Sequence, residues 1–94
     1  MDNNLYTYLK SLDLQDEDIE VLLCQCPNLD FIDGNNALLC VDIIIQAGYP
    51  KEDIDSLICI NPKILTYNPE ELIKTLSSFS GNIEQILKDN PFII

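Results

Sequence analysis

The chain has 94 residues, and its 47% hydrophobic and 22% charged residues are typical of a folded domain and exclude a disordered segment. Its 16 Asp and Glu outnumber its 5 lysines and leave a net charge of −11, which disfavours direct nucleic-acid binding because that binding needs cations at the phosphates. No apolar run approaches the roughly 20 residues that cross a bilayer, and the acidic amino terminus is typical neither of a secretory signal nor of a transit peptide. We therefore expect a cytoplasmic protein that does not contact a membrane.

Two helices are predicted at the start of the chain, over about residues 3–12 and 16–26. The first has apolar residues at the i, i+3, i+4 and i+7 positions of one helix face, namely Leu5, Tyr8, Leu9 and Leu12. Residues 16–18 give the second an acidic first turn, which complements a helix N-terminus. Pro27 ends this helix because a proline ring cannot continue it.

A short turn follows, in which we expect Leu29 and Phe31 to point into the core. Asp33 is the predicted N-cap of the next helix. Residues 37–47 are apolar at nearly every position, so we expect this helix to be the central one, enclosed by neighbours on several sides. Gly48 ends it as a residue that can adopt a positive φ.

Three further helices are predicted, the first of them opening at Pro50. The second begins with the clearest local signal in the chain: Asn68 as N-cap, Pro69 at the first helical position and Glu71 placed to complete a capping box. Its predicted core stripe consists of Leu72, Ile73, Leu76 and Phe79. The last helix spans about residues 82–89.

These helices recur with a period of about 35 residues. The shift places Asp53-Ile54 on Asp18-Ile19, Leu57 on Leu22, Cys59 on Cys24, Pro62 on Pro27, Ile64 on Leu29 and Asn68 on Asp33. We predict an all-α fold of about six short helices in about two and a half to three helix-turn-helix repeats, forming a compact bundle or a short right-handed solenoid. The single domain, 1–94, would comprise a half repeat at 3–14, repeats at 15–48 and 49–80, and a truncated repeat at 81–94.

The cysteines do not have the spacing of a zinc site, which usually shows two C-x2-4-C pairs, and the chain has no His. Cys24 and Cys59 occupy the same repeat position among Leu and Ile residues. We therefore interpret the cysteines as reduced, buried residues of the core, with a metal site or a disulfide as the alternative.

The second unit reads Gly48-Tyr49-Pro50-Lys51-Glu52-Asp53-Ile54, followed by Leu57-Ile58, Asn61-Pro62, Ile64-Leu65 and Asn68-Pro69-Glu70-Glu71-Leu72. This pattern resembles the repeat of the mitochondrial transcription termination factor (mTERF) family, which stacks pairs of helices into a superhelix. The resemblance covers nearly the whole chain and implies the fold. Family members are several-fold longer, carry many basic residues and bind nucleic acid in organelles, whereas this chain has no Arg. We therefore carry over the fold and keep a shortened nucleic-acid-binding protein only as an alternative function.

The sequence lacks the residues that catalysis or cofactor binding would need. It has no His and no Gly-rich phosphate loop, and helix capping explains its adjacent carboxylates. The segment 30–35 is a poor calcium loop because Ile32 stands where an oxygen ligand is needed. We predict a protein that is not an enzyme and has no cofactor and no metal.

The leading hypothesis is a small acidic protein-interaction module that binds a basic surface of another protein. Its candidate binding face is formed by the acidic first turns of the repeats, which we expect along one side: Asp16, Glu17, Asp18, Glu20, Glu52, Asp53 and Asp55. The alternative is that these residues are solvated helix starts that maintain solubility. A second hypothesis is an inhibitor of phage or plasmid type that mimics the charge of a nucleic acid.

The apolar end of the chain is a candidate for self-association. Phe92, Ile93 and Ile94 either pair between protomers or fold back on their own core, and we favour the second arrangement. We therefore expect a monomer or a weak homodimer.

Overall fold

The computed structural model describes residues 1–94 and contains six α-helices, three 3-10 helices and no strands. In chain order the elements are α1 (Asn3–Ser11), α2 (Asp16–Gln25), η1 (Pro27–Asp30), α3 (Gly34–Gln46), η2 (Lys51–Asp53), α4 (Ile54–Ile60), η3 (Pro62–Thr66), α5 (Pro69–Ser78) and α6 (Ile83–Asp89). The predicted all-α fold is confirmed. The order α-helix, 3-10 helix, α-helix occurs in α2–η1–α3 and again in α4–η3–α5, while a solenoid of stacked repeats stays a prediction.

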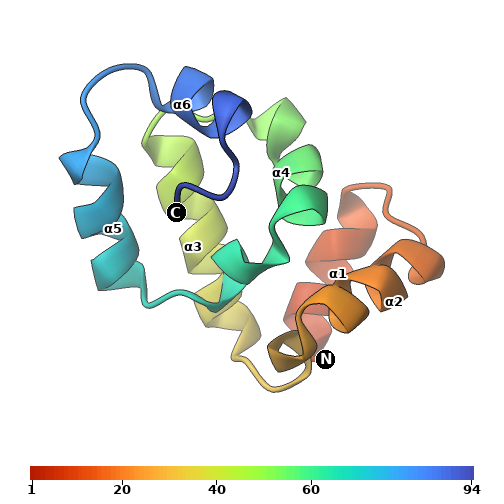
Figure 1. Cartoon of the computed structure of the whole chain (residues 1–94). Coiled ribbons are helices and arrows are strands. Elements are labelled where there is room, and N and C mark those ends of the chain that lie inside the picture. Colours follow the sequence, from red (N-terminus) through yellow and green to blue (C-terminus); the bar gives the residue numbers. More distant parts are fainter.

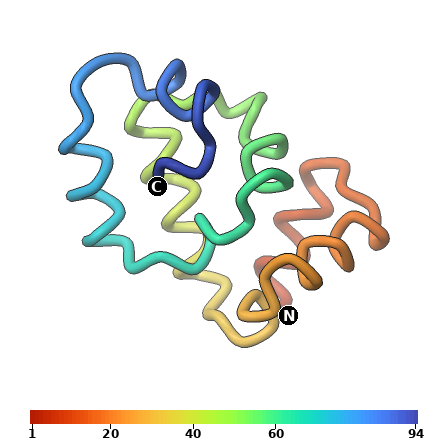
Figure 2. Tube along the Cα trace, viewed as in Figure 1, coloured from red at the N-terminus to blue at the C-terminus, as the bar shows by residue number.

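Helix α3 lies at the centre of the molecule and packs against α1, η3 and α5 (Figure 1). Helices α1 and α2 form one end of the body, and α5 and α6 lie toward the other (Figure 2). The principal extents are 36 × 22 × 20 Å, and the radius of gyration of 12.5 Å is close to the value of about 12 Å expected for a compact chain of this length. None of the helices is long and apolar enough to cross a membrane.

Local signals fix most of the helix ends. The Asp33 and Asn68 side chains accept hydrogen bonds from the backbone N–H groups of the first turns of α3 and α5, as predicted. Gly48 has a φ of +122°, which is accessible to glycine because it has no Cβ. On α2 the backbone N–H of Gln15 donates a hydrogen bond to Asp18 Oδ2 at 2.9 Å, whereas Glu71 makes no such bond to its N-cap.

Twenty buried apolar side chains form a single core cluster, to which every α-helix contributes. The prediction for Leu29 is confirmed, but Phe31 is 87% exposed. A 3-10 helix has about three residues per turn, so residues two positions apart point about 120° away from each other, and η1 is covered mainly by α2 and η3. Leu29 takes the inward position at the end of η1, and Phe31 is therefore directed to solvent.

The predicted core stripe of α5 is wrong at Ile73, which is 50% exposed. Leu72 and Leu76 are buried, and Ile73 lies about 100° around the helix from Leu72. Helix α3 is central as predicted but is not enclosed on all sides, because its Leu39 is 48% exposed.

All four cysteines are free thiols, and their environments differ. Cys40 is buried and its thiol donates a hydrogen bond to the Tyr67 carbonyl oxygen at 3.1 Å. Cys26 and Cys59 are partly buried against the core. The prediction of burial is wrong for Cys24, which is exposed because α2 turns Leu22 toward the core and the residue two positions later away from it.

Candidate functional site

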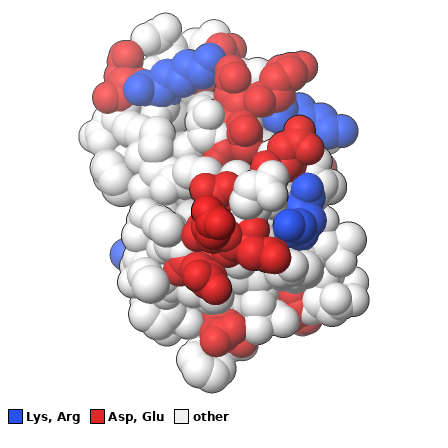
Figure 3. Space-filling model, turned by 90° about the vertical axis from the view of Figure 1, so that its right-hand side faces the viewer, with Lys and Arg blue, Asp and Glu red and all other residues white.

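Acidic side chains from α2, η2 and α4 lie on the side of the molecule that Figure 3 faces. The candidates on α2 and Glu52 on η2 are exposed, while Asp53 and Asp55 are partly buried. Most of the surface in Figure 3 is uncharged, and among its charged side chains carboxylates predominate over lysines. We use the name acidic face for the seven candidate carboxylates of α2, η2 and α4.

Acidic residues of α2 and α4 both affect the thiol of Cys59, which lies on α4. Burial raises the pKa of the Cys59 thiol, and the negative charges of Asp18 and Asp55 raise this pKa further. The pKa of the Tyr8 hydroxyl is likewise raised by burial and then by the charge of Asp55. Asp55 lies one turn before Cys59 on the same helix, whereas Asp18 belongs to α2.

Helix α1 contributes the first cation of the acidic face. The Tyr6 hydroxyl donates a hydrogen bond to Asp16 Oδ1 at 2.6 Å, and Lys10 Nζ lies 3.3 Å from the same oxygen. The hydrogen bond from Tyr6 and then the ammonium of Lys10 lower the pKa of the Asp16 carboxyl. The sequence pattern does not indicate this contact, because Tyr6 and Lys10 of α1 and Asp16 of α2 lie on separate helices.

Helix α6 contributes the second cation. Lys88 Nζ lies 2.8 Å from Asp53 Oδ2 and 2.9 Å from Glu84 Oε2, and these two carboxylates raise the pKa of the lysine. Glu84 is thus an acidic residue of this region that the repeat pattern did not indicate. Of the seven candidate carboxylates, Asp16 and Asp53 form ion pairs, and the other five form none, so the face keeps a net negative charge.

A second surface feature is an apolar groove between α3, α5 and the loop that leads into α6. Its volume is about 450 Å³, which is within the range of binding pockets. It is lined by Asp42, Ile43, Gln46, Ala47, Ile73, Leu76, Ser77, Phe79, Gly81 and Ile83. Sequence analysis did not predict it, since Ile73 and Phe79 were assigned to the core.

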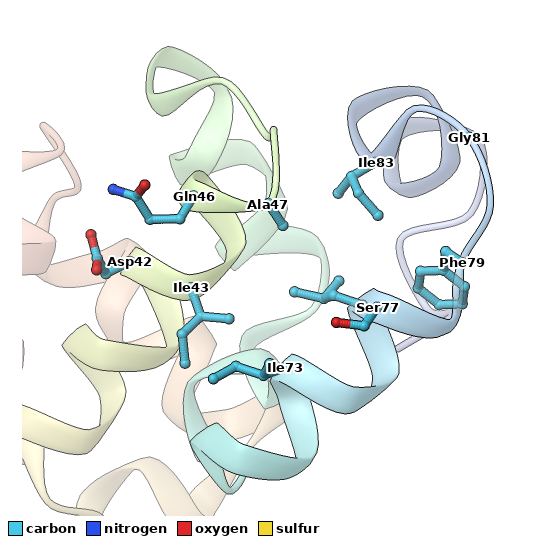
Figure 4. Close-up of a pocket in the computed structure, with 10 residues that line it drawn as sticks. Asp42, Ile43, Gln46, Ala47, Ile73, Ser77, Phe79, Gly81 and Ile83 are labelled. Carbon is cyan, nitrogen blue, oxygen red and sulfur yellow. The ribbon is translucent and has the colours of Figure 1, made fainter.

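The groove leaves apolar atoms open to solvent. Ile73 of α5 and Ile43 of α3 point toward one another across it, and Ile83 lies at its α6 end (Figure 4). Asp42 is the one ionisable residue in its lining and lies on the α3 side. Leu39, one helical turn before Ile43, continues the same exposed face of α3.

The apolar end of the chain folds back in part. Ile94 is partly buried against the core, whereas Phe92 is 66% exposed and Ile93 is also exposed. The segment is held by Asn61, whose buried side-chain Nδ2 donates a hydrogen bond to the Pro91 carbonyl oxygen at 3.0 Å. Self-association through Phe92 and Ile93 remains a prediction.

The structure has no group of three or more His, Cys, Asp or Glu side chains placed to hold a metal ion. No family model, no curated protein and no solved structure matches the chain. The resemblance to the mTERF family therefore stays a prediction from the repeat pattern, and function is argued from the two surfaces.

Proposed function

We propose that this chain is a non-enzymatic protein-interaction module whose acidic face binds a basic surface of another protein. The observation that carries the proposal is the exposed acidic first turn of α2, Asp16, Glu17 and Asp18, together with the predominance of carboxylates over lysines on the side that Figure 3 faces. A surface dominated by one charge sign attracts a partner of opposite sign, and it speeds association in a way that salt suppresses.

The lysines favour a protein partner over a nucleic acid. Lys10 and Lys88 are paired with carboxylates of the same chain, which leaves three lysines without an ion pair, Lys51, Lys63 and Lys74. Binding to the phosphates of a nucleic acid requires several free cations on one surface. Four free thiols also suit a reducing compartment, so we place the module in the cytoplasm.

Two charge-neutralised variants test the proposal. Glu17→Gln with Glu52→Gln removes two exposed carboxylates from the acidic face. The matched control, Glu70→Gln with Glu71→Gln, removes two exposed carboxylates from the first turn of α5. Both pairs change the net charge equally, and no side-chain hydrogen bond holds any of the four.

Each protein serves as bait for cell lysate at low and at high salt, and the bound protein and nucleic acid are identified. We expect the wild type and the control to retain the same basic proteins at low salt and to release them at high salt. The variant of the acidic face should retain several-fold less. If both variants retained the same amount of the basic proteins, net charge alone would explain the binding and the proposal would be wrong.

The same experiment separates the alternative functions. If the retained proteins are nucleic-acid-binding proteins, and added nucleic acid displaces them, the acidic face acts as a decoy. Recovery of nucleic acid itself would instead support a shortened nucleic-acid-binding protein of mTERF type.

A further inference from the structure

We propose that the groove between α3 and α5 is a second binding site, which accepts an amphipathic helix of another protein with apolar residues on one face and basic residues beside them. This site is separate from the acidic face and does not depend on the function proposed for that face. A partner's apolar side chains would enter between Ile43 and Ile73, and one of its cations would lie against Asp42.

The walls of the groove are the later parts of two helices. The lining runs over residues 42–47 at the end of α3 and 73–77 of α5, which correspond to about 9 and 8 Å at about 1.5 Å per residue. A bound helix would therefore contact the groove through one to two of its turns. The volume of about 450 Å³ lies between these walls, and the loop into α6 bounds one end. Apolar side chains at i, i+3, i+4 and i+7 are the usual contacts of a helix that lies in such a groove.

The exposed apolar surface of the groove walls supplies the driving force. Ile73 in the lining is 50% exposed, and Leu39, which lies outside the lining one turn before Ile43 on α3, is 48% exposed. Each belongs to a helix that already buries another face in the core. Covering these side chains would remove apolar area from water. The exposed parts of Ile73 and Leu39 do not contribute to the core, and a docked helix would cover them.

Charge selects the occupant. A second copy of this chain would bring another net charge of −11 and another Asp42 to the same place, which is unfavourable. The chain's own apolar end does not fill the groove, because Ile94 packs beside Tyr67 and Leu72 and is absent from the groove lining. With Asp42 as the one ionisable group in the lining, a cationic partner is the complementary one.

The test uses three synthetic peptides of about 15 residues as probes. The first consists of Leu and Lys arranged so that Leu forms one helix face. The second has the same composition in an order that forms no apolar face, and the third keeps the order of the first with Glu in place of Lys. Binding is measured by isothermal titration calorimetry, and the contact surface is mapped by amide chemical shifts in NMR spectra.

We expect the first peptide to bind at least about tenfold more tightly than the second or the third, with shifts concentrated along α3 and α5. The second peptide carries the same charge, so it measures attraction to the acidic face alone. Neutralising Glu17 and Glu52 should lower the affinity of both Lys peptides to a similar extent and leave their ratio unchanged.

Two variants locate the site. Ile73→Glu puts a carboxylate where the Leu face of the first peptide would lie, so the lost apolar contact and the cost of covering a charge should weaken this peptide about tenfold. Asp42→Asn removes the partner of a Lys side chain and should weaken it several-fold. Val21→Glu is the matched control, because Val21 is equally exposed on α2, far from the groove in sequence and absent from its lining. Circular dichroism on all three variants confirms that they fold.

Three results would overturn the proposal. The two Lys peptides could bind alike, which would leave only a charge effect. The Ile73→Glu and Val21→Glu variants could weaken binding equally, which would place the peptide elsewhere. Sedimentation could show a dimer of the wild type that Ile73→Glu abolishes, in which case the occupant is a second copy.

Discussion

The segments α2–η1–α3 and α4–η3–α5 have the same order of elements, and their inner positions behave alike. Leu22 and Leu57 stand one period apart, and each is 1% exposed. Leu29 and Ile64 are both fully buried in the 3-10 helices, and the N-caps of α3 and α5 are both polar side chains that bond the first turn. The shared pattern therefore specifies the interior of each segment.

The two segments differ where each meets the rest of the molecule. Pro62 and Leu65 of η3 are buried, whereas Pro27 and Asp30, one period earlier in η1, are exposed. The difference follows from position, because η3 packs against α3, α4 and η1 while η1 lies mainly against α2 and η3. One repeat pattern thus gives a central 3-10 helix in one place and a peripheral one in the other.

The largest expected effect is a difference in the free energy of unfolding between substitutions in η3 and in η1. Leu65→Ala removes a fully buried side chain and should lower the free energy of unfolding by about 2–5 kcal/mol. Asp30→Ala, at the equivalent position, removes only an ion pair with the amino terminus and should change it by less than about 1 kcal/mol. Denaturant titration followed by circular dichroism measures both. Similar losses at the two positions would contradict a central role for η3.

A smaller effect is expected at the position before each proline. Asn61 is 5% exposed and donates to the Pro91 carbonyl oxygen, so Asn61→Ala leaves that oxygen without its partner and should destabilise the protein by about 1–3 kcal/mol. Cys26, one period earlier, makes no such bond, and Cys26→Ala should change stability by about 1 kcal/mol or less.

Amide hydrogen exchange gives the matching local measurement. It should increase in the last residues of the chain in the Asn61→Ala variant and stay unchanged there in the Cys26→Ala variant. Unchanged exchange in both would mean that Asn61 does not hold this segment.

Much of the fold followed from the sequence, because caps and apolar periodicity act within one helix. The ends at Asp33, Gly48 and Asn68 were predicted for the right physical reason. The errors at Phe31 and Ile73 have a different origin. Both are apolar residues beside true core positions, and only the placement of neighbouring helices decides which side of an element is covered.

The two candidate surfaces were predictable to different degrees. The composition indicated an acidic surface, and the acidic helix starts were visible as residues 16–18 and 52–55. The cations that pair with them, Lys10 and Lys88, were not assigned because each contact joins separate elements. The groove left no signal at all, since it is a space between α3 and α5 and not a property of either helix.

The smallest expected effect concerns how the first segment is joined to α1. Asp16 is bonded to Tyr6 and Lys10, whereas Lys51, one period later, forms no ion pair. The Tyr6 hydroxyl is the main cause of the lowered pKa of Asp16, so Tyr6→Phe should move this pKa back toward its ordinary value. NMR titration of the Asp16 carboxyl carbon measures the shift directly, with Lys51→Met as the control that should not change it.

The same variant makes a prediction with a definite sign for stability against pH. A carboxyl whose pKa is lower in the folded state adds stability above its unfolded pKa, and this contribution is lost as the pH falls through the folded pKa. The Tyr6→Phe variant should therefore be slightly less stable than the wild type at neutral pH, and the difference due to Asp16 should vanish once the pH is below the lowered pKa. Because Asp16 is exposed, the difference in melting temperature should be small. If the pKa of Asp16 stays low in the variant, Lys10 and not Tyr6 causes the shift. The ion pair of Asp16 would then be the difference between the two segments at this position.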